Sequence, residues 1–226
     1  MAKTIQLRKI ISLHFKIPLK EADILIGEGR VRVNGKPSSP VAKLEERDEI
    51  VADGKIIRAA KKFAYLKFYK PRGIECTLNP GIENNLLTVF HFPEKLFPVG
   101  RLDKESEGLL LMTNDGELYR NIAWSESEKE KEYLVTVNKT IDENFIRTMQ
   151  EGIVIMGKRT KPAKVFAVSE NKFRIILTQG LNRQIRRMCY KLGYNVEELI
   201  RVRIDKIELG DLKPGEWENF IPSFQQ

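Results

Sequence analysis

The sequence contains few of the residues on which many enzymes depend. There are two cysteines and two histidines in 226 residues. Neither Cys76 and Cys189 nor His14 and His91 have a further metal ligand at a usual spacing, so no metal site is expected. The cysteines are expected to be reduced thiols of an intracellular protein, and the histidines to be structural or surface residues.

Long hydrophobic runs are also missing. No apolar stretch approaches the roughly 18 residues of a membrane span. The start of the chain, MAKTIQLRKI, lacks the apolar core of a signal peptide. The sequence therefore predicts a cytoplasmic protein that does not span a membrane.

Positive charge is abundant. Lys and Arg total 39 against 31 acidic residues, which gives a formal net charge of +8. Such a surplus is typical of proteins that bind a phosphate-rich partner such as nucleic acid. A membrane surface would also attract it, so charge alone does not identify the partner.

Residues 1–60 have a pattern of their own. Apolar residues recur at helical spacing in IQLRKIISLHF, and Pro18 suits the entry to a second helix, LKEADILIGEG, that Gly29 can end. The pairs Asn34-Gly35 and Asp53-Gly54 are strong signals for hairpin turns. Two helices followed by a small hairpin sheet are expected.

The stretch KEADILIGEGRVRVNGKP within this segment resembles the S-four-like, or alpha-L, RNA-binding module. On charge alone, a solvated charged face explains the segment equally well. The resemblance implies an RNA-binding domain at residues 1–60 whose basic side chains contact phosphates: Arg8, Lys9, Lys20, Arg30 and Arg32.

Residues 61–226 follow a basic linker and predict a second domain that is rich in strands. We expect strands at YLKFY, GLLLMT, EYLVTV, KVFAV, FRIILT and RVRIDKIEL, and helices at GELYRNIAW, DENFIRTMQEG and NRQIRRMCYKLG. The last helix is expected to begin at a cap formed by Asn182 and to end at Gly193. The whole chain is thus predicted to be α+β, with a mixed, mostly antiparallel second domain.

Four stretches of the second domain stand out: YKPRG, GRLDKESEGLLLMTNDG, KEYLVTV and GLNRQIRRMC. Each alone also fits an ordinary turn, loop, strand or solvated helix face. Taken together and in this order, they resemble the pseudouridine synthases of the RsuA/RluB/RluE/RluF group. EKEYLVTV and LNRQIRRMCYKLGYNVEEL are most similar to the RluF branch.

The resemblance implies an isomerase that detaches uracil from its ribose, turns the ring and rejoins it through carbon 5, without a metal or other cofactor. Asp103 occupies the position of the family's acid, acting either as nucleophile or as base. Arg186 matches the arginine that pairs with this acid, and an arginine suits that role because it stays charged. Tyr133 matches the tyrosine that stacks on the target ring and is a candidate to remove the ring proton. Glu105 and Glu107 are expected to be exposed, which leaves no second carboxylate of the kind that a glycosidase needs.

Other residues follow from the same resemblance. The target base must leave the RNA stack, and Arg101 is expected to fill the gap or to hold phosphate. Leu181 and Ile185 are expected to wall the pocket. Lys70 and Arg72 are expected to bind backbone phosphates, and Arg183 to contact phosphate or solvent.

The expected partner is RNA, most simply a uridine in a stem-loop of large-subunit ribosomal RNA, with another rRNA site or tRNA as alternatives. The protein is expected to be a monomer, as is usual for the family. A catalytically silent, ribosome-associated RNA-binding protein is a competing interpretation. A phosphodiester hydrolase is disfavoured because paired acids or histidines for metal ions are missing.

Overall fold

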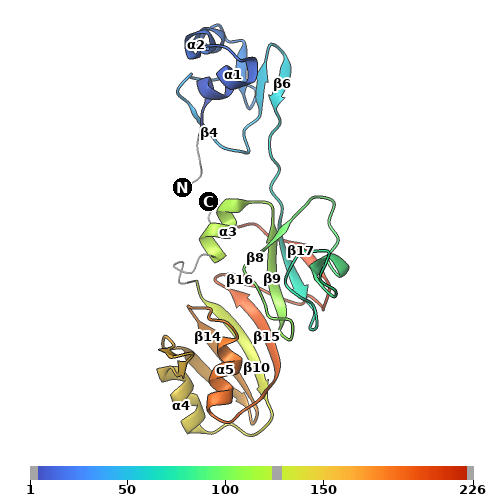
Figure 1. Ribbon diagram of the computed structural model, residues 1–226, viewed down its shortest axis with the longest axis vertical. Coiled ribbons are helices and arrows are strands. Elements are labelled where there is room, and N and C mark those ends of the chain that lie inside the picture. Colours follow the sequence, from blue (N-terminus) through green and yellow to red (C-terminus); the bar gives the residue numbers. More distant parts are fainter. Residues whose placement is uncertain (1–4, 124–128, 223–226) are drawn as a thin grey trace. The chain divides into compact units, whose positions relative to one another are not determined.

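The computed structural model describes residues 5–123 and 129–222 (Figure 1). The chain divides into two compact units, residues 1–63 and 64–226, and each is described by itself. That the first unit is an S-four-like module remains a prediction.

The first unit packs two short helices against a small sheet. Leu7 and Ile11 of α1, Ala22 and Ile26 of α2 and Ile50 of the sheet form its buried core. The sheet order is β3-β2-β5-β6, and β1 pairs separately with β4. The elements are β1 (Ile5–Gln6), α1 (Leu7–Phe15), α2 (Leu19–Gly27), β2 (Val31–Val33), β3 (Lys36–Pro37), β4 (Lys43–Leu44), β5 (Ile50–Ala52) and β6 (Lys55–Arg58).

The helix ends and turns of this unit agree with those predicted from the sequence. Pro18 immediately precedes α2, and Gly29 follows it with a φ of 73°. Asn34 and Gly35 have φ angles of 50° and 76°, and they join β2 to its antiparallel partner β3. Because few residues other than glycine and asparagine adopt such angles without strain, these positions are fixed by local chemistry. The predicted helices and turns are confirmed.

The second unit is built on a nine-stranded sheet with the order β13-β14-β10-β15-β9-β7-β17. In addition, β16 pairs with β15 and β8 pairs with β9. All of its pairings are antiparallel except that between β15 and β9. The strands are β7 (Tyr65–Lys70), β8 (Phe97–Val99), β9 (Glu107–Thr113), β10 (Lys131–Val137), β13 (Lys164–Ser169), β14 (Lys172–Leu177), β15 (Val196–Ile204), β16 (Ile207–Glu208) and β17 (Trp217–Asn219).

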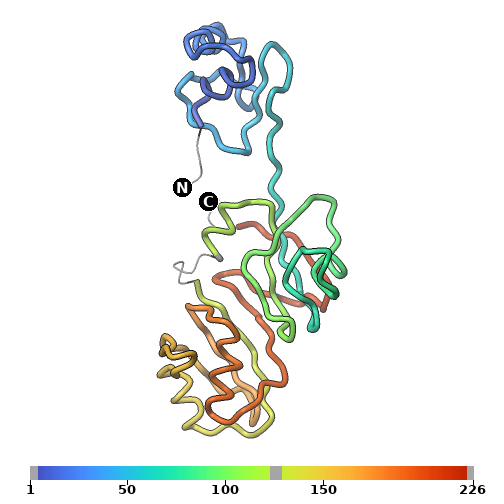
Figure 2. Tube along the Cα trace, in the orientation of Figure 1, coloured from blue at the N-terminus to red at the C-terminus, as the bar shows by residue number. Residues whose placement is uncertain are grey.

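Helices cover one face of the β13-β14-β10-β15 part of this sheet, where α4 and α5 lie over the strands (Figures 1 and 2). Phe145 and Met149 of α4 and Met188 of α5 pack with Val135 of β10 and Phe173 of β14 in one buried cluster. The remaining elements of the unit are α3 (Gly116–Ala123), α4 (Glu143–Glu151), α5 (Gln184–Lys191), the short 3-10 helix η1 (Leu86–Thr88) and a hairpin of β11 (Val154–Ile155) and β12 (Lys158–Arg159). Within the described ranges, no helix has the length and apolarity that crossing a membrane requires.

The observed fold is therefore α+β and mostly antiparallel, as predicted, but some boundaries differ. The cap predicted at Asn182 is wrong: α5 begins at Gln184, the preceding Arg183 is left-handed (φ 51°), and Asn182 accepts hydrogen bonds from the Arg187 guanidinium. The strand predicted over RVRIDKIEL is split into β15 and β16 by a turn at Asp205 (φ 52°). The strands β8, β11, β12 and β17 are too short to produce a periodic signal.

Two irregularities shape the middle of the sheet. Opposite β10, the register of β15 shifts by one residue, so that Glu132 pairs with Arg203 whereas Tyr133 pairs with Arg201. Val202 is the extra residue of this bulge. Gly108 (φ 98°) lies against β15 so closely that a Cβ atom would meet the carbonyl oxygen of Arg201 at 2.4 Å. Only glycine fits at this crossing.

Candidate active site

Asp103 lies on the loop that connects β8 to β9. This loop is held by its carbonyl groups. The Arg101 carbonyl accepts from Nη1 of Arg201 at 3.3 Å, the Lys104 carbonyl from the Gly73 amide at 2.8 Å, and the Glu105 carbonyl from Nη2 of Arg186 at 2.8 Å. The Asp103 carbonyl accepts from the Ser106 amide at 3.0 Å. The backbone around the acid is thus fixed from three directions.

The Asp103 carboxylate itself is left available. It is half-buried and faces a cavity of about 470 Å³. Within the described parts of the chain, no side chain donates a hydrogen bond or forms an ion pair to it. An acid on a rigid loop, unpaired and beside a cavity large enough for a nucleotide, is suited to react with a bound ligand.

Apolar side chains from several strands, α3, α5 and the adjoining loops form much of the cavity wall. Tyr133 of β10 is half-buried between the two main apolar clusters of the unit. Leu181 and Ile185 lie at the start of α5, and Leu199 belongs to β15. The remaining apolar lining residues are Val99, Leu102, Ile122, Leu177 and Ile204. A flat, apolar base would find hydrophobic contacts on these walls.

Cations surround the same space. Arg101, Lys131, Lys158, Arg183 and Arg201 all line it, with Asp103 as the acid among the described lining residues. Burial, together with the nearby positive charge of Arg201, lowers the pKa of Lys131. The cavity therefore combines apolar walls with a positive potential, which fits a nucleotide better than a neutral ligand.

Arg201 was not assigned a role from the sequence, although it is the most buried of these cations. Arg201 is 3 % exposed, and its Nε donates to the Leu109 carbonyl at 2.7 Å. Nη2 is buried and has no hydrogen-bond partner in the described structure. A buried, unsatisfied guanidinium nitrogen on a cavity wall is costly unless a ligand satisfies it. The sequence carries no signal for this orientation, because the orientation follows from the bulge at Val202.

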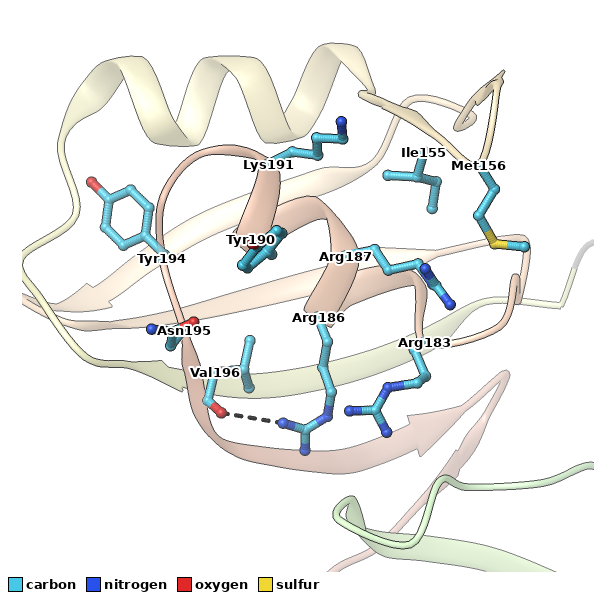
Figure 3. Close-up of a pocket in the computed structure, with 10 residues that line it drawn as sticks. All are labelled: Ile155, Met156, Arg183, Arg186, Arg187, Tyr190, Lys191, Tyr194, Asn195 and Val196. Atoms are coloured by element: carbon cyan, nitrogen blue, oxygen red, sulfur yellow. Dashed lines mark hydrogen bonds between the residues drawn. The ribbon is translucent and has the colours of Figure 1, made fainter.

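Arg186 lies next to the cavity, but its contacts differ from those expected. It donates to the Glu105 carbonyl, to Ser106 Oγ at 3.4 Å and to the Val196 carbonyl at 3.2 Å (Figure 3). The expected ion pair with Asp103 is not formed among the residues that the structure describes. Burial and then the repulsion by Arg183 lower the pKa of Arg186, whereas the charges of Glu105 and Asp103 oppose this effect.

Arg183, which directly precedes α5, lines the cavity beside Asp103. It forms an ion pair with the exposed Glu105. The hydrogen bond to Glu105 raises the pKa of Arg183, and the negative charge of Asp103 contributes in the same direction. Glu107, which was expected to be exposed, is half-buried and accepts from the Tyr69 hydroxyl at 3.4 Å.

The prediction that Lys70 binds phosphate is wrong. Lys70 is fully buried, and its Nζ donates to the carbonyls of Pro71 and Ile74, both at 2.8 Å. The alternation of β7 turns this side chain into the unit, where it fixes the loop that follows. Arg72, on that loop, is exposed and has no side-chain partner among the described residues.

In the first unit, the five basic side chains that are predicted to contact RNA divide into two groups. Arg8 forms an ion pair with Asp23 between the two helices, and Arg30 binds Asp53 through two hydrogen bonds of 2.7 and 2.8 Å. Lys9, Lys20 and Arg32 are exposed. Of the five basic residues predicted to contact RNA, only those of the second group present charges that no acid neutralises within the described residues.

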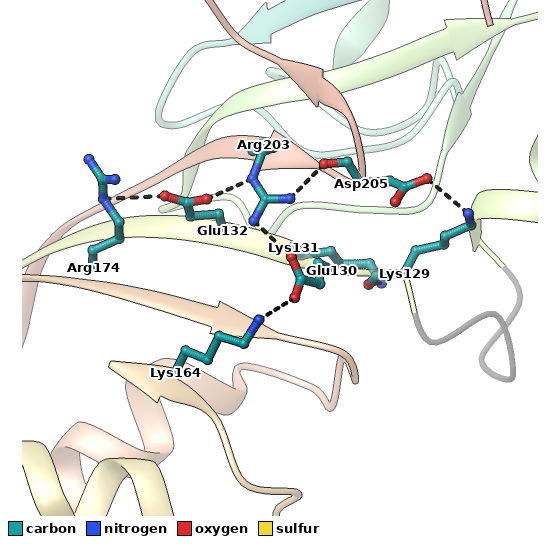
Figure 4. A network of polar contacts seen from close by, with 8 residues as sticks. All are labelled: Lys129, Glu130, Lys131, Glu132, Lys164, Arg174, Arg203 and Asp205. Atoms are coloured by element: carbon teal, nitrogen blue, oxygen red, sulfur yellow. Dashed lines mark hydrogen bonds and ion pairs between the residues drawn. The ribbon is translucent and has the colours of Figure 1, made fainter. Parts of the chain in front are cut away.

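The opposite face of the sheet carries a different set of charges (Figure 4). Glu132 is buried and receives Arg203 Nε at 2.7 Å and Arg174 Nε at 3.2 Å. Glu130 receives Arg203 Nη2 at 3.0 Å and Lys164 Nζ at 2.9 Å. These ion pairs tie β10 to its neighbours β14 and β15 behind Tyr133. Across the described chain, no group of three or more His, Cys, Asp or Glu side chains has an arrangement that could hold a metal ion.

Comparison with known proteins decides the family. Residues 64–191, which contain the whole loop around Asp103, β10 and α5, match the family model of RNA pseudouridylate synthase. The chain belongs to the RNA pseudouridylate synthase family. It is accordingly an isomerase that acts on RNA, and the resemblance found in the sequence is confirmed.

Relatives extend the match over both units. The chain is 40 % identical over 218 residues to the dual-specificity RNA pseudouridine synthase RluF of Escherichia coli K12, covering 96 % of this chain and 75 % of that protein. It is 30 % identical over 226 residues to the ribosomal large subunit pseudouridine synthase B of Bacillus subtilis, covering 96 % and 92 %. A crystal structure of a pseudouridylate synthase is similar with a TM-score of 0.66 and 28 % identity, covering 96 % of each chain.

Proposed function

We propose that this synthase isomerises a uridine in a stem-loop of large-subunit ribosomal RNA, with Asp103 as its reacting acid. The observation that carries the proposal is the unpaired Asp103 carboxylate on a fixed loop beside the 470 Å³ cavity. A carboxylate that no described side chain occupies can attack the sugar of a bound nucleotide or remove a proton from it.

The other cavity residues have complementary roles in this proposal. The target base is extruded from the RNA, which costs on the order of a few kcal/mol. Tyr133 stacks on the extruded ring and is placed to accept the proton of carbon 5 when the new carbon–carbon bond is complete. Leu181 and Ile185 hold the ring between apolar surfaces while it turns.

In this proposal, arginines next to Asp103 and elsewhere on the unit hold the RNA backbone. Arg183 and Arg186 both lie close enough to Asp103 to interact with its charge. Arg101 is exposed and lines the cavity, where it can contact phosphate or occupy the space that the base leaves, and the exposed Arg72 can contact phosphate from the loop after β7. Arg186 acts as a positioning residue, since it holds the carbonyl of Glu105.

The RNA class is inferred from relatives and from the first unit. One relative is named for the large ribosomal subunit, and the RluF proteins are named for dual specificity, which favours a second RNA substrate. Residues 1–60, in this proposal, capture the RNA through Lys9, Lys20 and Arg32. Arg8 and Arg30 support that surface through their ion pairs rather than by contacting RNA first.

The deciding experiment is tritium release from large-subunit rRNA that carries tritium at uracil carbon 5 and comes from a strain without the related synthases. Wild-type protein should release tritium, whereas Asp103→Asn should bind the same RNA and release none. Asp211→Asn provides a matched control, because it makes the same chemical change at an exposed position of the same unit.

Equal turnover by wild-type protein and Asp103→Asn would remove Asp103 from the mechanism. Release from small-subunit rRNA alone would leave the chemistry standing and would contradict the proposed target. Mapping the new pseudouridine then identifies the modified stem-loop.

A further inference from the structure

An exposed aromatic side chain stands on α5, outside the cavity of Asp103. Tyr190 is 74 % exposed, although it lies on a helix whose other face is buried in the core. Met156, from the turn between β11 and β12, is 67 % exposed and lines the same hollow of about 500 Å³. Large apolar side chains so fully in water are informative when they adjoin a shaped surface.

The hollow around Tyr190 is strongly basic. Arg183, Arg186, Arg187 and Lys191 line it, and the described lining residues include no acid (Figure 3). Arg187 precedes Tyr190 by three residues and Arg186 by four, so that they share one side of the helix. Lys191 is exposed, and its amino group has no partner within the described chain. An anionic ligand would meet several cations here. Arg183 is already paired with Glu105, whereas Arg186, Arg187 and Lys191 form no ion pair within the described residues.

This hollow neighbours the cavity of Asp103, because Arg183 lines both. A nucleotide that is one step along the strand from the extruded uridine would pass Arg183 and its partner Glu105 to reach this surface. An aromatic ring between cations matches a single-stranded nucleotide, whose base stacks on the ring while its phosphate contacts the charges. An acidic protein partner would account for the cations of this surface. It would not account for the exposed ring of Tyr190.

We propose that this α5 surface is a second nucleotide site, in which an unpaired base beside the target uridine stacks on Tyr190 and its phosphate contacts Arg187 and Lys191. The inference rests on the proposed function, since it assumes that RNA enters the cavity of Asp103. It adds a requirement that the target be flanked by an unpaired nucleotide.

Binding to RNA in the Asp103→Asn background tests this site without any turnover. The probe is fluorescently labelled single-stranded hexauridylate, with large-subunit rRNA transcripts as a second probe. Tyr190→Ala should weaken binding about tenfold, which is the usual effect of losing one stacked base. Tyr190→Phe should stay within about twofold of the parent protein, because it keeps the ring.

Two further variants sharpen the result. Tyr119→Ala removes a tyrosine that is 43 % exposed on α3 and should leave binding unchanged. Lys191→Gln should reduce the slope of log Kd against log salt by about 0.7, since one phosphate contact to a single strand is lost.

The proposal is overturned if Tyr190→Ala binds RNA as tightly as the parent protein, or if Tyr190→Phe loses as much affinity as Tyr190→Ala. An equal loss in Tyr119→Ala would also overturn it. Failure of the tritium assay with an intact Tyr190 effect would count against the proposed reaction while supporting the nucleotide site, so the two failures are distinguishable.

Discussion

The two faces of the sheet around β10 and β15 both carry charges, and they use them in opposite ways. On the face without helices, Glu132 and Glu130 neutralise Arg203, Arg174 and Lys164 in a closed network. On the helix side, Lys131 and Arg201 line a cavity with a single acid, Asp103, among the described lining residues.

The difference separates structural charges from functional ones. Paired charges satisfy each other, so they hold strands together and have little capacity for a ligand. The cations of the cavity are satisfied only in part, as the free Nη2 of Arg201 illustrates. Unsatisfied buried groups cost stability, and a protein keeps them where a ligand completes them.

The close contact between Gly108 and β15 can be disrupted by a substitution at Gly108. A Cβ atom in Gly108→Ala would lie 2.4 Å from the Arg201 carbonyl oxygen, and the φ of 98° is unfavourable for alanine. Overpacking and backbone strain together should lower the free energy of unfolding by about 4 kcal/mol. Urea unfolding measures this. Gly116→Ala, with ordinary contacts at the start of α3, should be unchanged or slightly more stable; a similar loss there would contradict the explanation.

Lys70 is a third kind of cation, because it is buried and its hydrogen bonds go to backbone carbonyls. Burial lowers its pKa from 10.5 to about 8. Below pH 8, both the folded and the unfolded states carry the charge and the folded state bears the desolvation cost. Between pH 8 and 10.5 the unfolded state binds more protons, so stability should rise with pH.

The measurement is urea unfolding across this pH interval. Relative to Lys70→Met, the wild-type protein should gain roughly 3 kcal/mol as the pH rises. Lys67→Met, on the same strand, keeps Lys70 and should follow the wild-type dependence. Parallel curves for wild type and Lys70→Met would show that Lys70 does not titrate in this range.

Arg201 and Arg203 provide the sharpest matched pair. Arg201→Met removes the hydrogen bonds to the carbonyls of Arg101 and Leu109 and the free nitrogen at the cavity. We expect the single-turnover rate to fall about 100-fold, which corresponds to about 2.7 kcal/mol of barrier. Arg203→Met should keep its rate within about threefold. Equal rates for the two variants would contradict the proposed difference between the cavity face and the opposite face.

The network on the opposite face should show a smaller effect, in stability alone. A double-mutant cycle of Glu132→Gln and Arg203→Met should give a coupling of about 1 kcal/mol, because this pair is well aligned and only slightly exposed. Thermal or urea unfolding supplies the four values. A coupling near zero would mean that the pair serves another purpose, such as keeping the face free of ligands.

Much of the fold and the family was accessible from the sequence, because the informative signals are local. Gly29 and the Asn34-Gly35 pair define chain reversals by their own backbone preferences, and the loop around Asp103 carries an uninterrupted motif. The incorrect cap at Asn182 shows the limit of such reasoning: Arg187 engages this side chain from the helix, a contact that propensity does not anticipate.

The sequence by itself determined the turns, the main helices and the basic character of the chain, and it identified Asp103 as the candidate acid, since each depends on neighbouring residues. Only the tertiary structure decided which cations face the cavity. Arg201 and Arg203 are two residues apart and should share a face of a regular strand, but the bulge at Val202 sends them to opposite sides. Likewise, only the structure shows that Lys70 is fully buried, with its amino group bound by the carbonyls of Pro71 and Ile74.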